Sequence, residues 1–234
     1  YVYKIQVLIV GAGPAGLSAA IQLKQISQKN NLDLSVCVLE KASEVGAHIH
    51  SGAVIETVAL DRLKPYWKEM DSPIKTKVKK DKLSYFGKDW SFSIPQIILP
   101  PMMKNHGNYI VSLSNVCKWL GEVAEGLGVE IYPGFTAQEP LFNDQNQLIG
   151  ILTGDMGRDA DGHETANFVP GMEIHAKYTL VAEGTRGSIT KQIEQKLLLR
   201  KNSDPQMKIF EIFSSDPFFE GGGSLRAVSL FIIG

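Results

Sequence analysis

A glycine-rich turn between a buried strand and a helix is the feature that most constrains how this chain folds. Residues 4–10 (KIQVLIV) are almost all β-branched or leucine, which predicts a strand buried on both faces. Residues 11–16 then read G-A-G-P-A-G and match G-x-G-x-x-G, and a helical stretch rich in alanine and leucine follows over 17–26. Such a turn presents helix N-terminal N–H groups to phosphates, so the sequence predicts a dinucleotide site here.

The residues of this turn have separate predicted roles. Gly11 permits the tight turn out of the strand, and Gly13 lets the backbone approach a pyrophosphate. Gly16 lets the helix lie close to the strand. Pro14 suits a first helical turn, where its missing N–H is not needed.

A second buried strand, predicted over 34–39 (LSVCVL), ends at Glu40 and completes a β-α-β unit with parallel strands. A carboxylate there can accept both ribose hydroxyls of an adenosine and would repel a 2′-phosphate, which disfavours NADP. The spacing of 29 residues between Gly11 and Glu40 does not decide between FAD and NAD. The later segments favour FAD, because a glycine loop, an apolar hairpin and a meander replace the regular βαβ units of NAD domains.

The remaining pattern predicts an α/β fold with a second, antiparallel layer. The expected elements are a helical segment around 58–66, a hairpin over 82–94, a strand over 109–113, a helix over 115–127 with Gly128 past its end, a strand over 129–132, a meander of 136–142, 147–155 and 172–177, and a buried run over 178–182.

Composition excludes several classes of protein. Twenty-four Lys and Arg balance 25 Asp and Glu, so no broad basic field attracts nucleic acid, and no nucleic-acid partner is expected. No apolar run approaches the roughly 18–20 residues that a membrane-spanning helix needs. Two cysteines, Cys37 and Cys117, cannot form a four-cysteine metal or iron–sulfur site within this chain. No catalytic triad, paired carboxylates or metal-ligand spacing stands out, so no catalytic residue and no metal ligand is predicted.

Residues 92–103 are apolar, contain three prolines and carry no charge. Prolines forbid a regular helix, so this stretch either packs as a loop on the domain's own core or forms an exposed apolar surface. We favour an exposed surface that dips into one leaflet and opens towards a lipid-soluble quinone, with nearby lysines meeting anionic headgroups. The residues expected to face the membrane or quinone are Ile94, Ile97, Ile98, Leu99, Met102 and Met103.

Seven blocks of sequence together resemble one family. They are 10–17 (VGAGPAGL), 40–41 (EK), 45–55 (VGAHIHSGAVI), 105–113 (NHGNYIVSL), 128–135 (GVEIYPGF), 154–157 (GDMG) and 171–184 (GMEIHAKYTLVAEG). Over roughly residues 4–206 the chain resembles the electron transfer flavoprotein–ubiquinone oxidoreductase family, which belongs to the glutathione-reductase-like FAD proteins. The resemblance implies that fold and an oxidoreductase that passes electrons from electron transfer flavoprotein to ubiquinone. It also implies a peripheral protein of the mitochondrial inner membrane or a bacterial inner membrane.

The resemblance also implies which residues contact FAD. The pyrophosphate would lie on the first glycine turn, the adenosine ribose on Glu40, the flavin beside the 46–53 loop, and the adenine beside the backbone of Ala137. The full implied set is Gly11, Gly13, Pro14, Ala15, Gly16, Glu40, Lys41, Gly46, Ala47, His48, Ser51, Gly52, Ala53, Ala137, Ala182, Glu183 and Gly184. For His48 we favour a loop histidine bonded to backbone over a role in proton transfer.

Three features depart from the family. Its [4Fe–4S] cluster is held by four cysteines in a C-terminal part, whereas no cysteine follows Cys117 here. A later glycine–aspartate FAD motif is absent, and the sequence after Gln206 no longer resembles the family. We therefore expect a truncated chain that binds FAD weakly: residues 1–73 and 105–190 as two parts of the FAD domain, 74–104 as the membrane-facing insertion, and 191–234 as a tail.

Two other hypotheses remain open. One is an FAD monooxygenase or a geranylgeranyl-reductase-like enzyme on the same fold, which would use NAD(P)H. The other is a non-catalytic fragment that binds a nucleotide or nothing.

Overall fold

The computed structural model describes residues 2–50, 52–158, 161–199 and 201. Ser51 and the expected atypical tail beyond residue 206 therefore lie outside the described residues. The chain divides into two compact units after Ile193, and the fold below is that of the first, residues 1–193.

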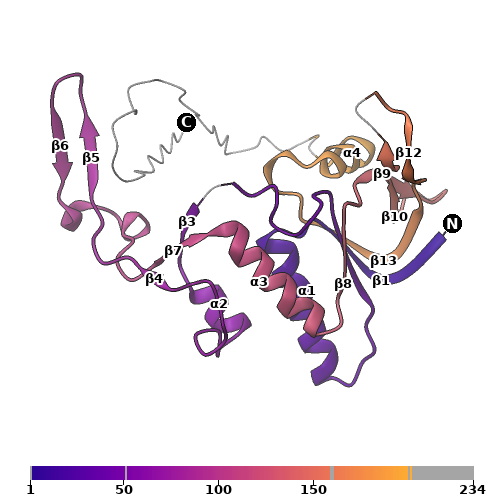
Figure 1. The fold of residues 1–234 in the computed structure, drawn as a ribbon, viewed down its shortest axis with the longest axis horizontal. Helices are drawn as coiled ribbons and strands as arrows, with labels where there is room; N and C mark the ends of the chain where they lie inside the picture. Colours follow the sequence, from indigo (N-terminus) through magenta and orange to yellow (C-terminus); the bar gives the residue numbers. More distant parts are fainter. Residues whose placement is uncertain (1, 51, 159–160, 200, 202–234) are drawn as a thin grey trace. The chain divides into compact units, whose positions relative to one another are not determined.

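A six-stranded sheet organises this unit in the order β8-β2-β1-β13-β10-β9 (Figure 1). Its parallel strands are β1 (Val2–Val10), β2 (Val36–Glu40), β8 (Glu130–Pro133) and β13 (Glu173–Val181), and its antiparallel strands are β9 (Ala137–Phe142) and β10 (Leu148–Thr153). The predicted β-α-β unit and parallel strands are confirmed. The sheet is thus mixed, with parallel pairing dominant.

The meander departs from the sequence prediction in two ways. Segments 172–177 and 178–182, predicted as two pieces, form the single strand β13, which pairs with β1 along its length and with β10 over Glu173–His175. Strands β9 and β10 extend the main sheet instead of building a second layer, since β10 pairs with both β13 and β9, and Gly150 permits the close approach of β10 to β13. A Cβ at Gly150 would overlap the Ile174 carbonyl oxygen. A separate pair, β11 (Met156–Arg158) and β12 (Glu164–Val169), was not predicted.

Alternate residues of β1 enter two different apolar clusters, which places the clusters on opposite faces of the sheet. Val7 and Ile9 pack with α1 (Pro14–Lys29) and α3 (Leu113–Gly126), which lie side by side in Figure 1. Leu8 and Val10 pack with Ile189 of α4 (Ser188–Leu197). The sheet therefore carries α1 and α3 on one face and the start of α4 on the other.

The helical segment, the hairpin and the strand predicted over 58–66, 82–94 and 109–113 are confirmed with shifted ends, whereas two further strands and three 3-10 turns were not predicted. A small sheet has the order β3-β7-β4, and the other elements are the short helix, the hairpin and the 3-10 turns. Their bounds are β3 (Gly52–Ile55), α2 (Val58–Leu63), β4 (Thr76–Lys77), β5 (Leu83–Phe86), β6 (Ser91–Ile94), η1 (Gln96–Ile98), η2 (Pro101–Met103), β7 (Tyr109–Ser112) and η3 (Gly184–Arg186). Helix α3 starts two residues earlier than predicted because Ser112 caps it through Asn115 N–H, and Gly128 follows its end with φ +83°.

Residues 83–103, which we call the apolar segment, expose large side chains on the hairpin and on the turns η1 and η2. Ile97 is 87% exposed, and other exposed members are Tyr85, Phe86, Trp90, Phe92, Ile98 and Met103. Leu99, expected to face the membrane, is only 8% exposed and so does not belong to this surface, and Ile94 is half-buried. The Met102 side chain lies outside the described residues. In the part of the chain that the structure describes, no helix is both long and apolar enough to cross a bilayer.

Both cysteines are buried, Cys37 in β2 and Cys117 in α3. Burial raises the pKa of the Cys37 thiol to about 12 and that of Cys117 to about 11, with Glu130 adding to the first and Glu40 to the second. Both thiols are therefore neutral and shielded at neutral pH.

We predict that iodoacetamide at pH 8 labels neither cysteine in the folded protein and both after unfolding in urea, as measured by intact mass. Because the folded thiols keep their protons above pH 9 while the unfolded ones lose them, the free energy of unfolding should fall as pH rises from about 9 to about 12. Rapid labelling of either cysteine without unfolding would contradict the buried placement.

Candidate functional site

The carboxyl ends of β1, β2 and β13 meet at one edge of the sheet. Gly11 N–H donates to the Leu39 carbonyl at 2.8 Å, and Ala182 N–H donates to the Val10 carbonyl at 2.8 Å. From this edge the chain leaves β1 into α1 on one face and leaves β13 towards α4 on the other. Ligands of open α/β sheets bind at such a switch point, so the edge is the candidate site.

Two glycines of the turn are required by the protein itself. Gly11 has φ +107°, and a Cβ there would lie 2.5 Å from the Ala182 carbonyl oxygen. A Cβ at Gly16 would overlap the Gly11 carbonyl oxygen and lie 3.2 Å from Ile9 Cγ2. These two residues let the turn close against β13 and let α1 lie on β1.

At Gly13, by contrast, no contact within the protein requires a glycine. Its backbone is extended (φ −80°, ψ −178°), and a Cβ there would meet no protein atom within 4 Å. It precedes α1, which begins without a side-chain cap and with Leu17 N–H to the Gly13 carbonyl (3.0 Å) as its first helical bond. The N–H groups of Ala15 and Gly16 therefore lie ahead of the helical ladder, as an anion site at a helix N-terminus requires.

Glu40 points towards this turn. One carboxylate oxygen accepts the Ala12 N–H at 3.0 Å and the other accepts the Ala42 N–H at 2.8 Å. A carboxylate can accept about four hydrogen bonds, so these two leave capacity for a ligand's hydroxyl groups. The predicted placement of Glu40 beside the glycine turn is confirmed; its contact with a ribose remains a prediction.

The loop that holds Gly46, Ala47 and His48 is fixed against α3. Gly46 has φ +84°, a Cβ there would lie 2.7 Å from the Ser114 carbonyl oxygen, and Ser114 Oγ donates to the Gly46 carbonyl at 2.9 Å. Ser114 was missed by sequence reasoning, because no local pattern signals a contact between residues 68 positions apart. The His48 side chain is exposed.

A charged pair supports the same loop. Lys118 Nζ lies 3.0 Å from Glu44 Oε1, and both side chains are partly exposed, so the pair contributes little energy and mainly orients the loop. Beyond the loop, Gly52 and Ala53 lie in β3, paired with Ser112 and Val111 of β7.

The other predicted FAD contacts lie around the same edge with different exposures. Lys41 is exposed, directly after Glu40. Ala137 begins β9 and packs against the second apolar cluster, and the turn before it is tied to the segment after Glu40 by Gly134 N–H to the Ala42 carbonyl (2.7 Å).

The Glu183 side chain is occupied by the protein. Its carboxylate accepts the N–H groups of Ile189 (3.2 Å) and Thr190 (2.9 Å) and the Thr190 hydroxyl (3.0 Å), at the start of α4. Within residues 182–184, the backbone is therefore what faces the candidate site.

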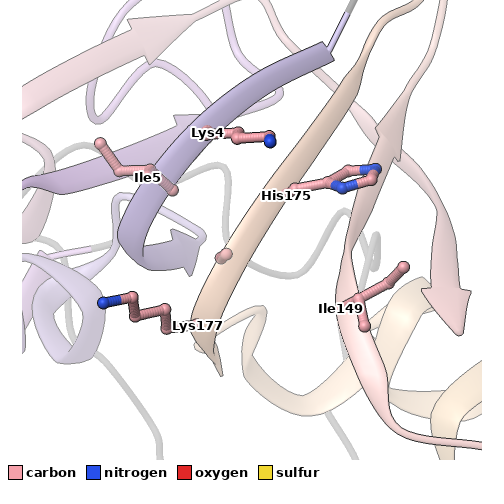
Figure 2. Close-up of a pocket in the computed structure, with 6 residues that line it drawn as sticks. Lys4, Ile5, Ile149, His175 and Lys177 are labelled. Atoms are coloured by element: carbon pink, nitrogen blue, oxygen red, sulfur yellow. The ribbon is translucent and has the colours of Figure 1, made fainter. Parts of the chain in front are cut away.

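A separate shallow hollow of about 300 Å³ is shown in Figure 2. Lys4, Ile5, Ile149, His175 and Lys177 line it, from β1, β10 and β13. Lys4 and His175 are register partners near the starts of their strands, at the opposite end of β1 from Gly11. No predicted site residue lines this hollow. Within the described ranges, no group of three or more His, Cys, Asp or Glu side chains could hold a metal ion.

Comparison with known proteins finds relatives that share one name. The chain is 52% identical over 203 residues to the mitochondrial electron transfer flavoprotein–ubiquinone oxidoreductase of Dictyostelium discoideum, covering 87% of this chain and 33% of that protein. It is 50% identical over 219 residues to the Pseudomonas aeruginosa protein of that name, covering 92% of this chain and 40% of that protein. The family resemblance is confirmed. The chain spans about a third to two-fifths of the length of the curated relatives it matches.

The fold comparisons show a Rossmann-like architecture. A family model described as an NAD(P)-binding Rossmann-like domain matches residues 9–74, which include the glycine turn and Glu40. Among solved structures, a geranylgeranyl bacteriochlorophyll reductase-like protein of Thermoplasma acidophilum has a TM-score of 0.55 at 17% identity, covering 82% of this chain and 42% of that one. A myxobacterial chondrochloren halogenase, described as a variant of FAD-dependent halogenases, has a TM-score of 0.51 at 18% identity, covering 81% and 39%. At these identities the likeness shows the fold alone.

We predict opposite effects of alanine at two glycines of the turn. Gly16→Ala should lower the free energy of unfolding by roughly 1–3 kcal/mol, because its Cβ must displace the Gly11 backbone. Gly13→Ala should leave it unchanged or raise it by up to about 1 kcal/mol, because its backbone suits alanine and the Cβ meets open space. Urea unfolding followed by circular dichroism measures both, and equal destabilisation would contradict the roles assigned.

Proposed function

We propose that this chain is the FAD-binding part of an electron transfer flavoprotein–ubiquinone oxidoreductase. The carrying observation is identity near 50% over about nine-tenths of the chain to relatives of that name. The geometry of the candidate site supports FAD, because Gly13 leaves room that the fold does not use and Glu40 lies beside it.

Different residues of the site then bind different parts of FAD. The N–H groups of Ala15 and Gly16 bind the pyrophosphate, and the open backbone at Gly13 lets it approach. Glu40 accepts the adenosine ribose hydroxyls with its remaining lone pairs. The Gly46–Ala47 turn, held by Ser114, and the backbone of 182–184 orient the flavin half.

Bound FAD supplies the redox chemistry, and the protein supplies binding, orientation and electrostatics. In the proposed reaction the electron donor is reduced electron transfer flavoprotein and the acceptor is ubiquinone. The [4Fe–4S] cluster expected of the family belongs to a part of the protein outside this chain.

The apolar segment is the proposed contact with membrane and quinone. Its side chains, led by Ile97 and Ile98, are exposed on a hairpin and turns that pair with no other strand among the described residues. Such a surface suits insertion into one leaflet. We therefore infer a peripheral protein, and the named relatives favour a mitochondrial or bacterial inner membrane as its location.

FAD binding tests the site directly. Titration of the chain with FAD, followed by flavin fluorescence, should show weak saturable binding. Gly13→Ala should weaken it by at least about tenfold, because the new Cβ occupies the path of the pyrophosphate. The matched control is Gly126→Ala, at the end of α3, where a Cβ also meets open space; it should leave the affinity unchanged. Equal FAD affinity in the Gly13→Ala variant would contradict the site.

The electron donor separates the proposed function from a monooxygenase or reductase that uses NAD(P)H. With excess FAD bound, NADPH should not bleach the flavin absorbance of the chain, whereas reduced electron transfer flavoprotein should. Bleaching by NADPH alone would favour the alternative enzyme, and absence of any flavin binding would favour a non-catalytic fragment.

A further inference from the structure

The segment that carries the exposed apolar side chains is also strongly basic. Residues 74–104 contain seven lysines and two aspartates, a net of five positive charges, while the whole chain has a net charge of −1. The rest of the chain therefore carries six more acidic than basic side chains. All seven lysines, Lys75, Lys77, Lys79, Lys80, Lys82, Lys88 and Lys104, are exposed.

Hydrogen bonds tie the two ends of the apolar segment together, next to four of these lysines in sequence. Val78 N–H donates to the Asn108 carbonyl at 2.8 Å, Gly107 N–H donates to the Val78 carbonyl at 3.3 Å, and Asn105 N–H donates to Asp81 Oδ2 at 2.8 Å. These bonds hold the incoming and outgoing chain side by side. Lys79, Lys80, Lys82 and Lys104, which we call the lysine collar, each directly precede or follow one of the bonded residues in sequence, so their backbones lie at this base.

Asp81, which lies between lysines of the collar in sequence, is held by hydrogen bonds to Asn105 and does not pair with a lysine among the described residues. Asp81 is half-buried, and the same carboxylate oxygen accepts both the backbone N–H and the side-chain amide of Asn105. Its role is thus to tie the base of the segment. The second acidic residue, Asp89, lies in the hairpin turn next to Lys88, away from the collar in sequence.

The apolar side chains of the hairpin lie between the lysine collar at its base and Lys88 in its turn. Tyr85 and Phe92 are register partners, and the Tyr85 and Trp90 rings lie 5.7 Å apart, so aromatic groups gather near the turn that carries Lys88. Aromatic rings flanked by lysines suit the boundary between headgroups and acyl chains, where long basic side chains reach the phosphates.

We propose that the lysine collar makes the membrane contact of this protein selective for anionic phospholipids. The inference rests on the membrane contact proposed above and adds its lipid specificity. The apolar segment supplies insertion, which depends little on headgroup charge, and the collar supplies attraction to a negative leaflet, which salt screens. An acidic protein is the other partner that such a charge could attract, but the adjacent exposed isoleucines and aromatics favour a bilayer.

The test is partition of the 234-residue chain onto vesicles, measured by co-sedimentation at low salt. Binding should be tighter to phosphatidylcholine vesicles with about 30% phosphatidylserine than to pure phosphatidylcholine, and the difference should vanish at about 1 M NaCl, where the Debye length is about 3 Å. The variant K79Q/K80Q/K82Q/K104Q should lose roughly 600-fold in affinity for the anionic vesicles, at about fivefold for each of the four lysines, with little change on neutral ones.

Two matched variants complete the design. K4Q/K29Q/K177Q/K191Q removes four exposed lysines elsewhere and should bind anionic vesicles nearly as the parent does. I97S/I98S should weaken binding to both kinds of vesicle, because it removes exposed apolar surface without changing charge.

The outcomes separate the two proposals. Equal binding of the parent to both vesicles overturns the lipid selectivity, and equal loss in the collar and control variants overturns the collar as its source; both results leave the membrane contact standing. Binding to neither vesicle overturns both and favours an acidic protein partner. Neither result bears on FAD binding, which the fluorescence titration measures independently.

Discussion

The close approach of the first glycine turn to its two neighbouring strands is the constraint on which the rest of the structure depends. Gly11 lies against the Ala182 carbonyl, and its N–H bonds to Leu39 at the end of β2. Any side chain at Gly11 or Gly16 would push α1 off β1 or the turn off β13. The same approach brings Glu40 and the 182–184 backbone to one edge, so the fold and the candidate site share one packing requirement.

Within this turn, structure and function draw on different residues. Gly11 and Gly16 are explained by protein atoms, whereas Gly13 is not, since its backbone suits any residue and a Cβ would meet nothing. Glu40, by contrast, serves the fold and the candidate site together. Its carboxylate accepts the N–H groups of Ala12 and Ala42 and still has lone pairs for a ligand. A site built this way is formed before a ligand arrives, which lowers the ordering cost of binding.

The features that could be predicted from the sequence are those set by residues close together along the chain. The buried runs of β1 and β2, the glycine turn and the Gly128 end of α3 were all readable, because burial periodicity and backbone restrictions act over a few residues. The sequence did not reveal that β13 is one strand shared between parallel and antiparallel partners, or that Ser114 fixes the Gly46 turn. Those features depend on contacts between distant segments. Leu99 shows the same limit, since an apolar stretch does not reveal which of its members turns inward.

The most direct measurement of the central claim is the position of FAD on the folded chain. In a titration of isotope-labelled protein with FAD, followed by amide NMR, the largest shifts should fall on Gly13, Ala15 and Gly16, with Ala12 and Ala42 perturbed through Glu40. Shifts centred instead on Lys4, His175 and Lys177, around the hollow of Figure 2, would place the ligand at the opposite end of the sheet and contradict the account.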